Sequence, residues 1–411
     1  MLSHIKTMHP KEISILDYYY PLPDSKIAQH PVEHRDKSKL LVSNNGEIED
    51  SVFDNIGGFL PSNSLIVYND TKVIRARMQF KKETGARIEI FILEPLSPTK
   101  EIQNAFQVTS TCEWKCLIGN AKKWKSGKLR LEVEFQGNII ELFGEKKEAI
   151  GNSFRVIFSW NPSSLTFSDI LMANGSIPLP PYMKRDTNKE DVERYQTIYA
   201  RHQGSVAAPT AGLHFTKKVI QSLKEKNIKE NYVSLHVGAG TFKPVSSEQI
   251  KDHEMHTEQV VIHKNLVEDI LKYQNKKIIA VGTTTTRSLE SMYWYGCKLI
   301  VDKNAAFHIK QWQPYESNND ISTKQSLEAI LNFMNKNNID EIHGDTQIII
   351  APSYNFKIVD ILITNFHQPK STLLLLVSAF YGEKWRDSYN YALDNDFRFL
   401  SYGDSCLFYK K

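Results

Sequence analysis

Apolar and polar residues alternate along the chain between about residues 84 and 160. In "ARIEIFILE" the side chains of Ile88, Ile90 and Ile92 share one face, and "KLRLEVEF" alternates Leu129 and Leu131 with charged residues. Glycines interrupt the alternation at residues 85, 119, 127, 137, 144 and 151. A period of two is that of a half-buried β-strand, so this stretch predicts an all-β module, either a sandwich or a barrel.

After Trp160 strand-like apolar runs alternate with helical patterns. Each strand-like run ends in small or polar residues: "NYVSLHVGAGTF", "KKIIAVGTTTTRS", "TQIIIAPSY" and "FKIVDILITNFH". Helical spacing is present in "FTKKVIQSLKEKN" and in "STKQSLEAILNFMNK", where Ser322 and Gln325 form a capping-box pattern. The alternation predicts an α/β domain with a largely parallel sheet or barrel, whose ligand sites lie at the carboxyl ends of the strands.

We expect two domains because 411 residues exceed one typical hydrophobic core. A larger, barrel-like α/β domain is predicted over residues 1–68 and 161–411. A small β-barrel domain is predicted to be inserted at residues 69–160, where the alternating pattern lies.

The composition is that of a soluble globular protein, with 41% apolar and 24% charged residues. Its four cysteines favour a reducing cytosol over a disulfide scaffold, and Cys112 and Cys116 lack the further ligands of a zinc site. The start of the chain has no signal-peptide core, and the longest apolar run, "LLLLVSAF", is too short to span a membrane. We therefore expect a cytoplasmic protein with no membrane contact and no metal.

Two segments have the composition of ligand-binding loops. The stretch "GSVAAPTAGLHFT" is too broken for a helix or strand and too apolar for a solvated linker, and its small residues let backbone amides approach a ligand. "VGTTTTRSLES" places Gly282 and four threonines between a strand and a helix, a pattern that binds carboxylate or phosphate, with Arg287 as a bidentate partner. The alternative for the second segment is an ordinary helix start with a solvated arginine.

Histidines recur at the predicted strand ends. His214, His236 and His367 each stand near Gly, Asn or Pro, which favours one shared pocket over three separate core histidines. Histidine also suits proton transfer near neutral pH. His253 and His256 are three residues apart, which would place them on one helix face, but no third metal ligand is identifiable. We therefore prefer a structural or substrate-contacting role for these two.

A basic stretch, "WKCLIGNAKKWKSGKLR", contains six basic residues and no acidic one. Trp114 and Trp124 lie among them and could stack on bases. We predict nucleic-acid contact at Lys122, Lys123, Trp124, Lys125, Lys128 and Arg130. The alternative is a solvated charged face with structural tryptophans.

The chain closely resembles the S-adenosylmethionine:tRNA ribosyltransferase-isomerase family of queuosine biosynthesis. Five segments carry the resemblance: "GSVAAPTAGLHFT", "LHVGAGTFKPV", "DHEMHTE", "VGTTTTRSLES" and "TNFHQPKSTLLLLVSAF". Further segments follow in the family's order: "HRDKSKLL", "YNDTKVIRARM", "IPLPPYMKR" and "FLSYGDSCLF". The resemblance covers nearly the whole chain and implies an α/β, barrel-like domain with an inserted small β-barrel, in agreement with the two patterns above.

The resemblance also implies a reaction. The ribosyl group of S-adenosylmethionine is transferred to the aminomethyl arm of 7-aminomethyl-7-deazaguanine in the tRNA anticodon and is isomerised to an epoxycyclopentanediol. Epoxyqueuosine forms, and adenine and methionine leave. S-adenosylmethionine is then a consumed substrate, and no cofactor is implied. We expect a monomer.

The reaction needs proton transfers, for which His214, His236 and His367 are the candidates without individual assignment. The sulfonium favours an acidic or aromatic wall, for which Asp70 or Glu290 could serve. The predicted substrate-binding residues are Asn69, Asp70, Arg77, Ala208, Thr210, Gly212, Gly238, Gly240, His253, His256, Thr283, Thr284, Arg287, Glu290 and Asn365.

The chain departs from the family in three places. Arg75 stands where the family usually has proline, "GDTQIIIAPS" lacks the family's aromatic residue and final glycine, and the chain is longer than expected between Met292 and Asp345. These departures bear on the identity of the substrate more than on the class of reaction. The alternatives are a non-catalytic or altered-substrate RNA-binding paralogue, and a tRNA methyltransferase, whose glycine-rich loop we do not find.

Overall fold

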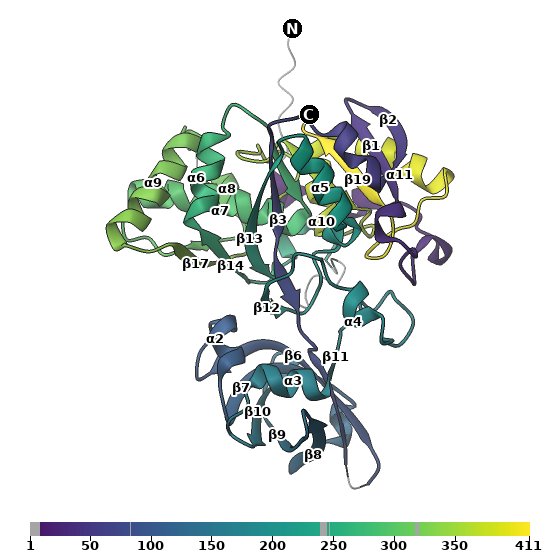
Figure 1. Ribbon diagram of the computed structural model, residues 1–411, viewed down its shortest axis with the longest axis vertical. Helices are drawn as coiled ribbons and strands as arrows, with labels where there is room; N and C mark the ends of the chain where they lie inside the picture. The colour runs from purple at the N-terminus through teal and green to yellow at the C-terminus, as the bar shows by residue number, and fades with distance from the viewer. Residues whose placement is uncertain (1–8, 83, 239–244, 246, 317–319) are drawn as a thin grey trace.

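The larger part of the protein is built on one mixed sheet of ten strands (Figure 1). The computed structural model describes residues 9–82, 84–238, 245, 247–316 and 320–411. Four central strands, β13, β3, β15 and β18, run parallel, as the sequence pattern predicted. The strands lie in the order β16 (His308–Ile309), β17 (Glu341–Thr346), β14 (Glu258–His263), β13 (Lys229–His236), β3 (Leu65–Asn69), β15 (Ile278–Val281), β18 (Ile361–Asn365), β19 (Ser405–Tyr409), β1 (Lys39–Asn44) and β2 (Glu47–Val52).

Helices cover both faces of this sheet because successive strand residues point to opposite sides. In β3, Leu65 and Val67 pack on one face, whereas Ile66 and Tyr68 pack on the other. The first face is covered by α6 (Lys264–Lys272), α7 (Thr283–Val301), α8 (Gln313–Glu316), α9 (Thr323–Asn337), α10 (Thr372–Tyr381) and α11 (Trp385–Asp394). The second face is covered by α1 (Ile56–Phe59), α5 (Lys217–Glu225) and the short 3-10 helix Thr210–His214.

A second sheet of seven antiparallel strands lies apart from the first (Figure 1). The predicted alternation is confirmed, since Ile88, Ile90 and Ile92 are fully buried. Two helices, α2 (Ile102–Gln107) and α3 (Phe167–Asn174), pack against this sheet. The strand order is β11 (Gly175–Ser176), β5 (Arg77–Lys81), β6 (Arg87–Ser97), β7 (Thr111–Gly119), β10 (Ser153–Asn161), β9 (Asn138–Ile150) and β8 (Lys128–Phe135).

The strand pairings leave the second sheet open, with β11 at one end and β8 at the other. They do not confirm the predicted closed barrel. Helix α3 and strand β11 follow residue 160, the predicted domain boundary, and both pack with the second sheet. Between the two sheets, β4 (Thr71–Val73) pairs with β12 (His202–Ser205), and α4 (Asp191–Arg194) lies nearby (Figure 1).

The segment between Met292 and Asp345 includes the helices α8 and α9. Helix α9 begins with the predicted capping box of Ser322 and Gln325. It packs on α7, where Gly296 has no room for a Cβ atom because the carbonyl of Ser326 would lie 2.2 Å away. Among the described residues, no helix has the length and apolar character needed to cross a membrane.

Glu290 on α7 anchors the segment that leads into β18. Its buried carboxylate accepts hydrogen bonds from the Tyr354 hydroxyl at 2.8 Å and from the N–H groups of Lys357, Ile358 and Val359 at 2.9, 3.0 and 3.1 Å. Burial raises the pKa of this carboxyl, and the four donors oppose that shift by stabilising the charged form. This anchor fixes the start of β18 and therefore the position of Asn365 at its carboxyl end.

Replacing Glu290 by glutamine is expected to lower the free energy of unfolding by about 2–4 kcal/mol. The substitution keeps the shape but turns one acceptor oxygen into an amide group that faces N–H donors. Urea denaturation measures the change. Glu328→Gln on the exposed side of α9 is the control and is expected to stay within about 0.5 kcal/mol of the parent protein. Equal stabilities for the two variants would contradict the anchoring role.

Candidate active site

A pocket opens at the carboxyl ends of β15 and β18, where the strand pattern predicted a ligand site. Its walls come from residues 207–211, the start of α7, residues 253–258 and the segment 364–373. We call it the main pocket. It brings together nine of the predicted site residues: Ala208, Thr210, His253, His256, Thr283, Thr284, Arg287, Asn365 and His367.

One wall of the main pocket is the amino-terminal end of α7. Gly282 precedes the helix at a φ of +93°, a conformation that suits glycine. The hydroxyls of Thr285 and Thr286 donate to carbonyls of the preceding turn, and no side chain caps the first amides of the helix. Uncapped N–H groups at a helix start attract an anion.

Arg287 lies one turn along α7 and is 6% exposed, so the alternative of a solvated arginine is wrong. Its Nη1 pairs with the Glu258 carboxylate, and its Nε donates to the Ile348 carbonyl at 3.1 Å. Nη2 is buried and has no hydrogen-bond partner in the described part of the chain. A charged nitrogen without a partner at a pocket wall is a donor for an anionic ligand group.

Asn365 and His367 lie at the end of β18 and line the main pocket. His367 Nε2 is 2.9 Å from Thr364 Oγ1, and its backbone N–H donates to the Tyr389 hydroxyl at 3.1 Å. Burial lowers the pKa of His367 to about 3, so this ring is neutral at pH 7. Asn365 Oδ1 is buried without a partner among the described residues, which leaves an acceptor in the wall.

His214 lies behind Asn365 and does not line the main pocket. Its Nδ1 is 2.7 Å from Ser38 Oγ, and its Nε2 is 3.1 Å from Asn365 Nδ2. Burial lowers the pKa of His214 to about 3, with smaller contributions from Arg398 and Arg35. Because both ring nitrogens are engaged, His214 orients the Asn365 amide rather than offering a nitrogen to a ligand.

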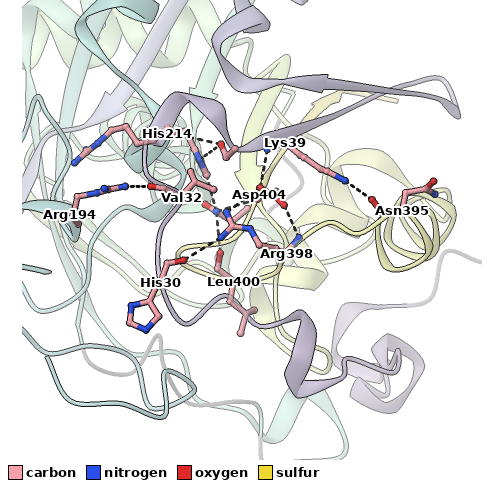
Figure 2. A network of polar contacts seen from close by, with 12 residues as sticks. His30, Val32, Lys39, Arg194, His214, Asn395, Arg398, Leu400 and Asp404 are labelled. Atoms are coloured by element: carbon pink, nitrogen blue, oxygen red, sulfur yellow. Dashed lines mark hydrogen bonds and ion pairs between the residues drawn. The ribbon is translucent and has the colours of Figure 1, made fainter. Parts of the chain in front are cut away.

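Figure 2 shows the polar network around His214. Asp404 accepts hydrogen bonds from the backbone N–H groups of Lys39 at 2.9 Å and Arg398 at 2.7 Å. The guanidinium of Arg398 lies 3.5 Å from the same carboxylate, whose pKa is raised by burial. The network ties β1 to the turn before β19. The Leu400 carbonyl in that turn accepts from the Asn365 amide at 3.2 Å.

His236 ends β13 and lines a second cavity between the two sheets, which we call the His236 cavity. It shares His256 and Val237 with the main pocket. His236 Nδ1 is 3.0 Å from Thr71 Oγ1, whereas Nε2 is buried with no partner in the described chain. Burial lowers the pKa of His236 to about 4, so the ring is neutral at pH 7. Gly204 allows this packing, since a Cβ there would come within 2.3 Å of Nδ1.

Three predicted residues make structural contacts outside the main pocket. Asn69 donates to the Leu235 carbonyl at 3.0 Å and accepts from its N–H at 3.1 Å, which joins β3 to β13. Asp70 accepts from Ser234 Oγ at 2.6 Å, and burial raises its pKa. Glu290 is the anchor of the 357–359 segment described above. None of the three lines the main pocket as an acidic wall for a cation.

The remaining predicted residues are spread over other parts of the fold. Gly212 is a packing position, because a Cβ there would lie 2.0 Å from the Tyr199 hydroxyl. The Arg77 guanidinium lies 5.3 Å from the ring centre of Phe91 in the second sheet. Gly238 lines the His236 cavity. Gly240 lies outside the described residues.

His253 and His256 do not share a helix face, which the metal hypothesis would need. Residues 253–257 form an irregular segment between the turn Ile250–Asp252 and β14, so their spacing does not align the rings on one face. Burial and His256 lower the pKa of His253. No group of three or more His, Cys, Asp and Glu residues able to hold a metal ion is present in the described ranges.

The predicted stacking of Trp124 on bases is also wrong. Trp124 is fully buried, and Trp114 is buried between two phenylalanine rings, so the alternative of structural tryptophans is correct. Arg130 is exposed but pairs with Glu132 at 2.6 Å and with Glu141. The exposed lysines of the stretch are Lys122, Lys123, Lys125 and Lys128.

Sequence reasoning missed two partners of the site. Glu258 forms the ion pair that fixes Arg287, and it is the last residue of the motif "DHEMHTE". Its negative charge was the available signal, because a buried arginine needs an acidic partner. Ser38, directly before β1, fixes the His214 ring and stands in "HRDKSKLL", more than 170 residues away in sequence. No local pattern predicts a contact of that separation.

The fold is of the α/β class, and its main pocket places uncapped helix amides, an unpartnered guanidinium nitrogen and the neutral His367 ring at the ends of strands. Comparison with known proteins identifies the family. Residues 15–408 match the family described as queuosine biosynthesis protein, and the chain belongs to that family.

Several relatives are similar over nearly their whole length. The chain is 38% identical to a protein of Halothermothrix orenii over 96% of this chain and 99% of that protein. It is 37% identical to one of Geotalea uraniireducens, over 96% and 99% of the two chains. Both relatives are named S-adenosylmethionine:tRNA ribosyltransferase-isomerase. Among solved structures, an S-adenosylmethionine tRNA ribosyltransferase from Thermotoga maritima aligns with 95% of this chain and 99% of its own, at 27% identity and a TM-score of 0.45.

The buried neutral histidines predict a loss of stability below pH 6.5. The pKa values of His214, His236 and His367 are lowered from 6.5 to about 3, 4 and 3. The unfolded chain therefore takes up protons first, so their stabilising contribution is complete above pH 6.5 and falls as the pH drops toward the folded-state values. Each contributes a loss of about 2 kcal/mol between pH 7 and pH 5.

Urea denaturation at several pH values between 7 and 5 measures this slope. A His367→Asn variant is expected to lose about a third of the histidine-dependent slope, whereas His256→Asn, at an exposed position, is expected to leave it unchanged. A slope that is the same in both variants and the parent protein would contradict the assignment.

Proposed function

We propose that this protein is an S-adenosylmethionine:tRNA ribosyltransferase-isomerase. It transfers and isomerises the ribosyl group of S-adenosylmethionine onto 7-aminomethyl-7-deazaguanine in tRNA, which gives epoxyqueuosine-tRNA, adenine and methionine. Membership of the queuosine biosynthesis family and relatives named for this activity over nearly their full lengths support the proposal.

One observation carries the proposal within the site: the unpartnered Nη2 of Arg287 lies beside the uncapped start of α7, at the wall of the main pocket. Both groups attract an anion. S-adenosylmethionine carries one carboxylate, on its methionine part. We infer that Arg287 and the amides of Thr283 and Thr284 hold that carboxylate.

We infer that His236 and His367 transfer protons and that His214 is a positioning residue. A sulfonium acidifies its adjacent 5′-carbon, and a ring that is neutral at pH 7 has a free nitrogen that can accept that proton. The resulting imidazolium is a strong acid because burial lowers its pKa, and it can return the proton to the leaving adenine. His236 has the unpartnered Nε2 that such a base requires.

We further propose that lysines in the turns beside the second sheet, exposed at 122, 123 and 125 and partly exposed at 82, contact tRNA phosphates. Lys82, Lys122, Lys123 and Lys125 surround one shallow surface depression. Phosphate contacts of this kind supply affinity without sequence preference, and they weaken as salt concentration rises.

Other features of the enzyme follow as proposals. We propose that it acts in the cytoplasm as a monomer, on the anticodon region of tRNA, and uses no cofactor because S-adenosylmethionine is consumed. We also propose two domains, residues 1–68 with 161–411 and an inserted small β-barrel at 69–160. The packing of α3 and β11 supports extending the second domain to residue 176.

The test of this function is turnover with S-adenosylmethionine and tRNA that carries 7-aminomethyl-7-deazaguanine, followed by mass spectrometry. Adenine and methionine released together with a nucleoside that gains the cyclopentanediol are expected. S-adenosylhomocysteine with a methylated nucleoside would identify a methyltransferase instead. Tight tRNA binding without any product would identify a non-catalytic paralogue.

Replacing Arg287 by lysine is expected to raise the KM for S-adenosylmethionine about 10- to 100-fold and to change kcat less. Lysine can keep the charge opposite Glu258, but it has no second nitrogen in the position of Nη2. Steady-state kinetics at saturating tRNA measure both constants, and thermal unfolding checks the fold. An unchanged KM would contradict the carboxylate contact.

A further inference from the structure

A groove at the junction of the two sheets is separate from both cavities. It is lined by residues 72–75, by α3, and by α4 with residues 196–198. Figure 1 shows α3 and α4 on either side of the junction. We call it the junction groove. It shares no lining residue with the main pocket or the His236 cavity.

Three large apolar side chains are exposed in the junction groove. Met172 from α3 is 46% exposed, and Val192 and Ile198 from the opposite wall are 41% and 42% exposed. Single exposed apolar residues are ordinary on a protein surface. Three that converge from both walls of one groove indicate a contact surface.

Cations exceed anions around these apolar residues. Arg35, Lys72 and Arg75 line the groove, against the single carboxylate of Glu193. Arg75 Nη1 donates to the Met172 carbonyl at 2.8 Å, which holds the guanidinium at the edge of the apolar surface. Lys72 is exposed and forms no ion pair with any described residue. The groove therefore suits an anionic partner with flat apolar faces.

A buried hydroxyl adds a polar point to the groove. Thr197 is 5% exposed, and its Oγ1 has no hydrogen-bond partner among the described residues. A hydroxyl can donate and accept, so it can bond to the edge of any base. A buried polar atom without a partner is costly, and a bound base edge would remove that cost.

We propose that the junction groove binds an unstacked nucleotide of the tRNA substrate, an inference that rests on the proposed function for its choice of partner. The base lies on Met172, Val192 and Ile198, and Lys72 with Arg75 holds its phosphate. Single-stranded RNA sites combine cationic contacts to phosphates with surfaces, usually aromatic, on which bases lie; here the aliphatic side chains of the groove supply that surface. An apolar peptide would leave the cations without a counter-charge, so the charge distribution favours RNA.

Met172→Glu tests the apolar contact, because it places a carboxylate in the groove at a half-exposed helix position. The dissociation constant for the substrate tRNA and the KM for tRNA are expected to rise about tenfold, within the range of one stacked base. The KM for S-adenosylmethionine is expected to be unchanged. Val301→Glu is the matched control, since Val301 is 83% exposed on α7 outside the groove, and it is expected to bind tRNA like the parent protein.

Lys72→Gln tests the phosphate contact. The slope of the logarithm of tRNA affinity against the logarithm of salt concentration is expected to become shallower by about 0.7, as for one phosphate on a single strand. Equal tRNA affinities for Met172→Glu and Val301→Glu would overturn the proposal. So would an unchanged salt slope in Lys72→Gln, because the groove would then bind no phosphate.

The binding measurement separates failure of this inference from failure of the proposed function. If the parent protein binds tRNA but forms no product, the proposed enzymatic function is wrong. The tRNA affinities of the two groove variants then still test whether the junction groove binds RNA. If product forms and neither variant changes tRNA affinity, the function stands and the groove is not an RNA site.

Discussion

The buried ion pair between Arg287 and Glu258 is the interaction on which the rest of the main pocket depends. It links the first turns of α7 to the start of β14, and the same guanidinium bonds to the Ile348 carbonyl after β17. Removing one member of a buried pair typically costs about 3–5 kcal/mol, because it leaves an uncompensated charge. The pair also fixes the guanidinium plane, so that Nη2 is the nitrogen without a protein partner.

Burial of the histidine rings explains both their neutral charge at pH 7 and the loss of stability that we expect in acid. His236 and His367 are neutral at pH 7 because burial disfavours the charged ring, and the same burial makes the folded protein bind fewer protons than the unfolded chain. A more open site would reduce the expected acid sensitivity, but it would also raise both pKa values and protonate part of the two rings that we propose as proton acceptors. Stability in acid and availability of the neutral ring therefore oppose each other in this fold.

The sequence predicted elements whose pattern is local. Alternation identified the second sheet, apolar runs identified β13, β15 and β18, and a capping box identified α9. The fourth apolar run, "TQIIIAPSY", was wrongly predicted as a strand, because β17 ends at Thr346 and the buried residues after it form no strand. The sequence did not predict which individual polar or aromatic side chains are buried. Trp124 and Glu290 have residue types that suit a surface or a ligand, but tertiary contacts from distant segments bury them. The contact between Ser38 and His214 was missed for the same reason, because it joins two short 3-10 segments that are 176 residues apart in the chain.

The boundary between the two sheets was hardest to predict, because α3 belongs to the second sheet through packing rather than through any break in its sequence pattern. That boundary has a mechanistic consequence. Thr71 and Lys72 are neighbours on β4: Thr71 is buried with its hydroxyl 3.0 Å from His236 Nδ1, whereas Lys72 is exposed in the junction groove. Adjacent strand residues point to opposite sides, so one short strand connects the ring in the His236 cavity to the proposed RNA contact. If the proposed phosphate contact at Lys72 forms, it restrains the same short strand whose Thr71 hydroxyl holds the His236 ring, so the proposed tRNA contact and the proposed proton acceptor share one element.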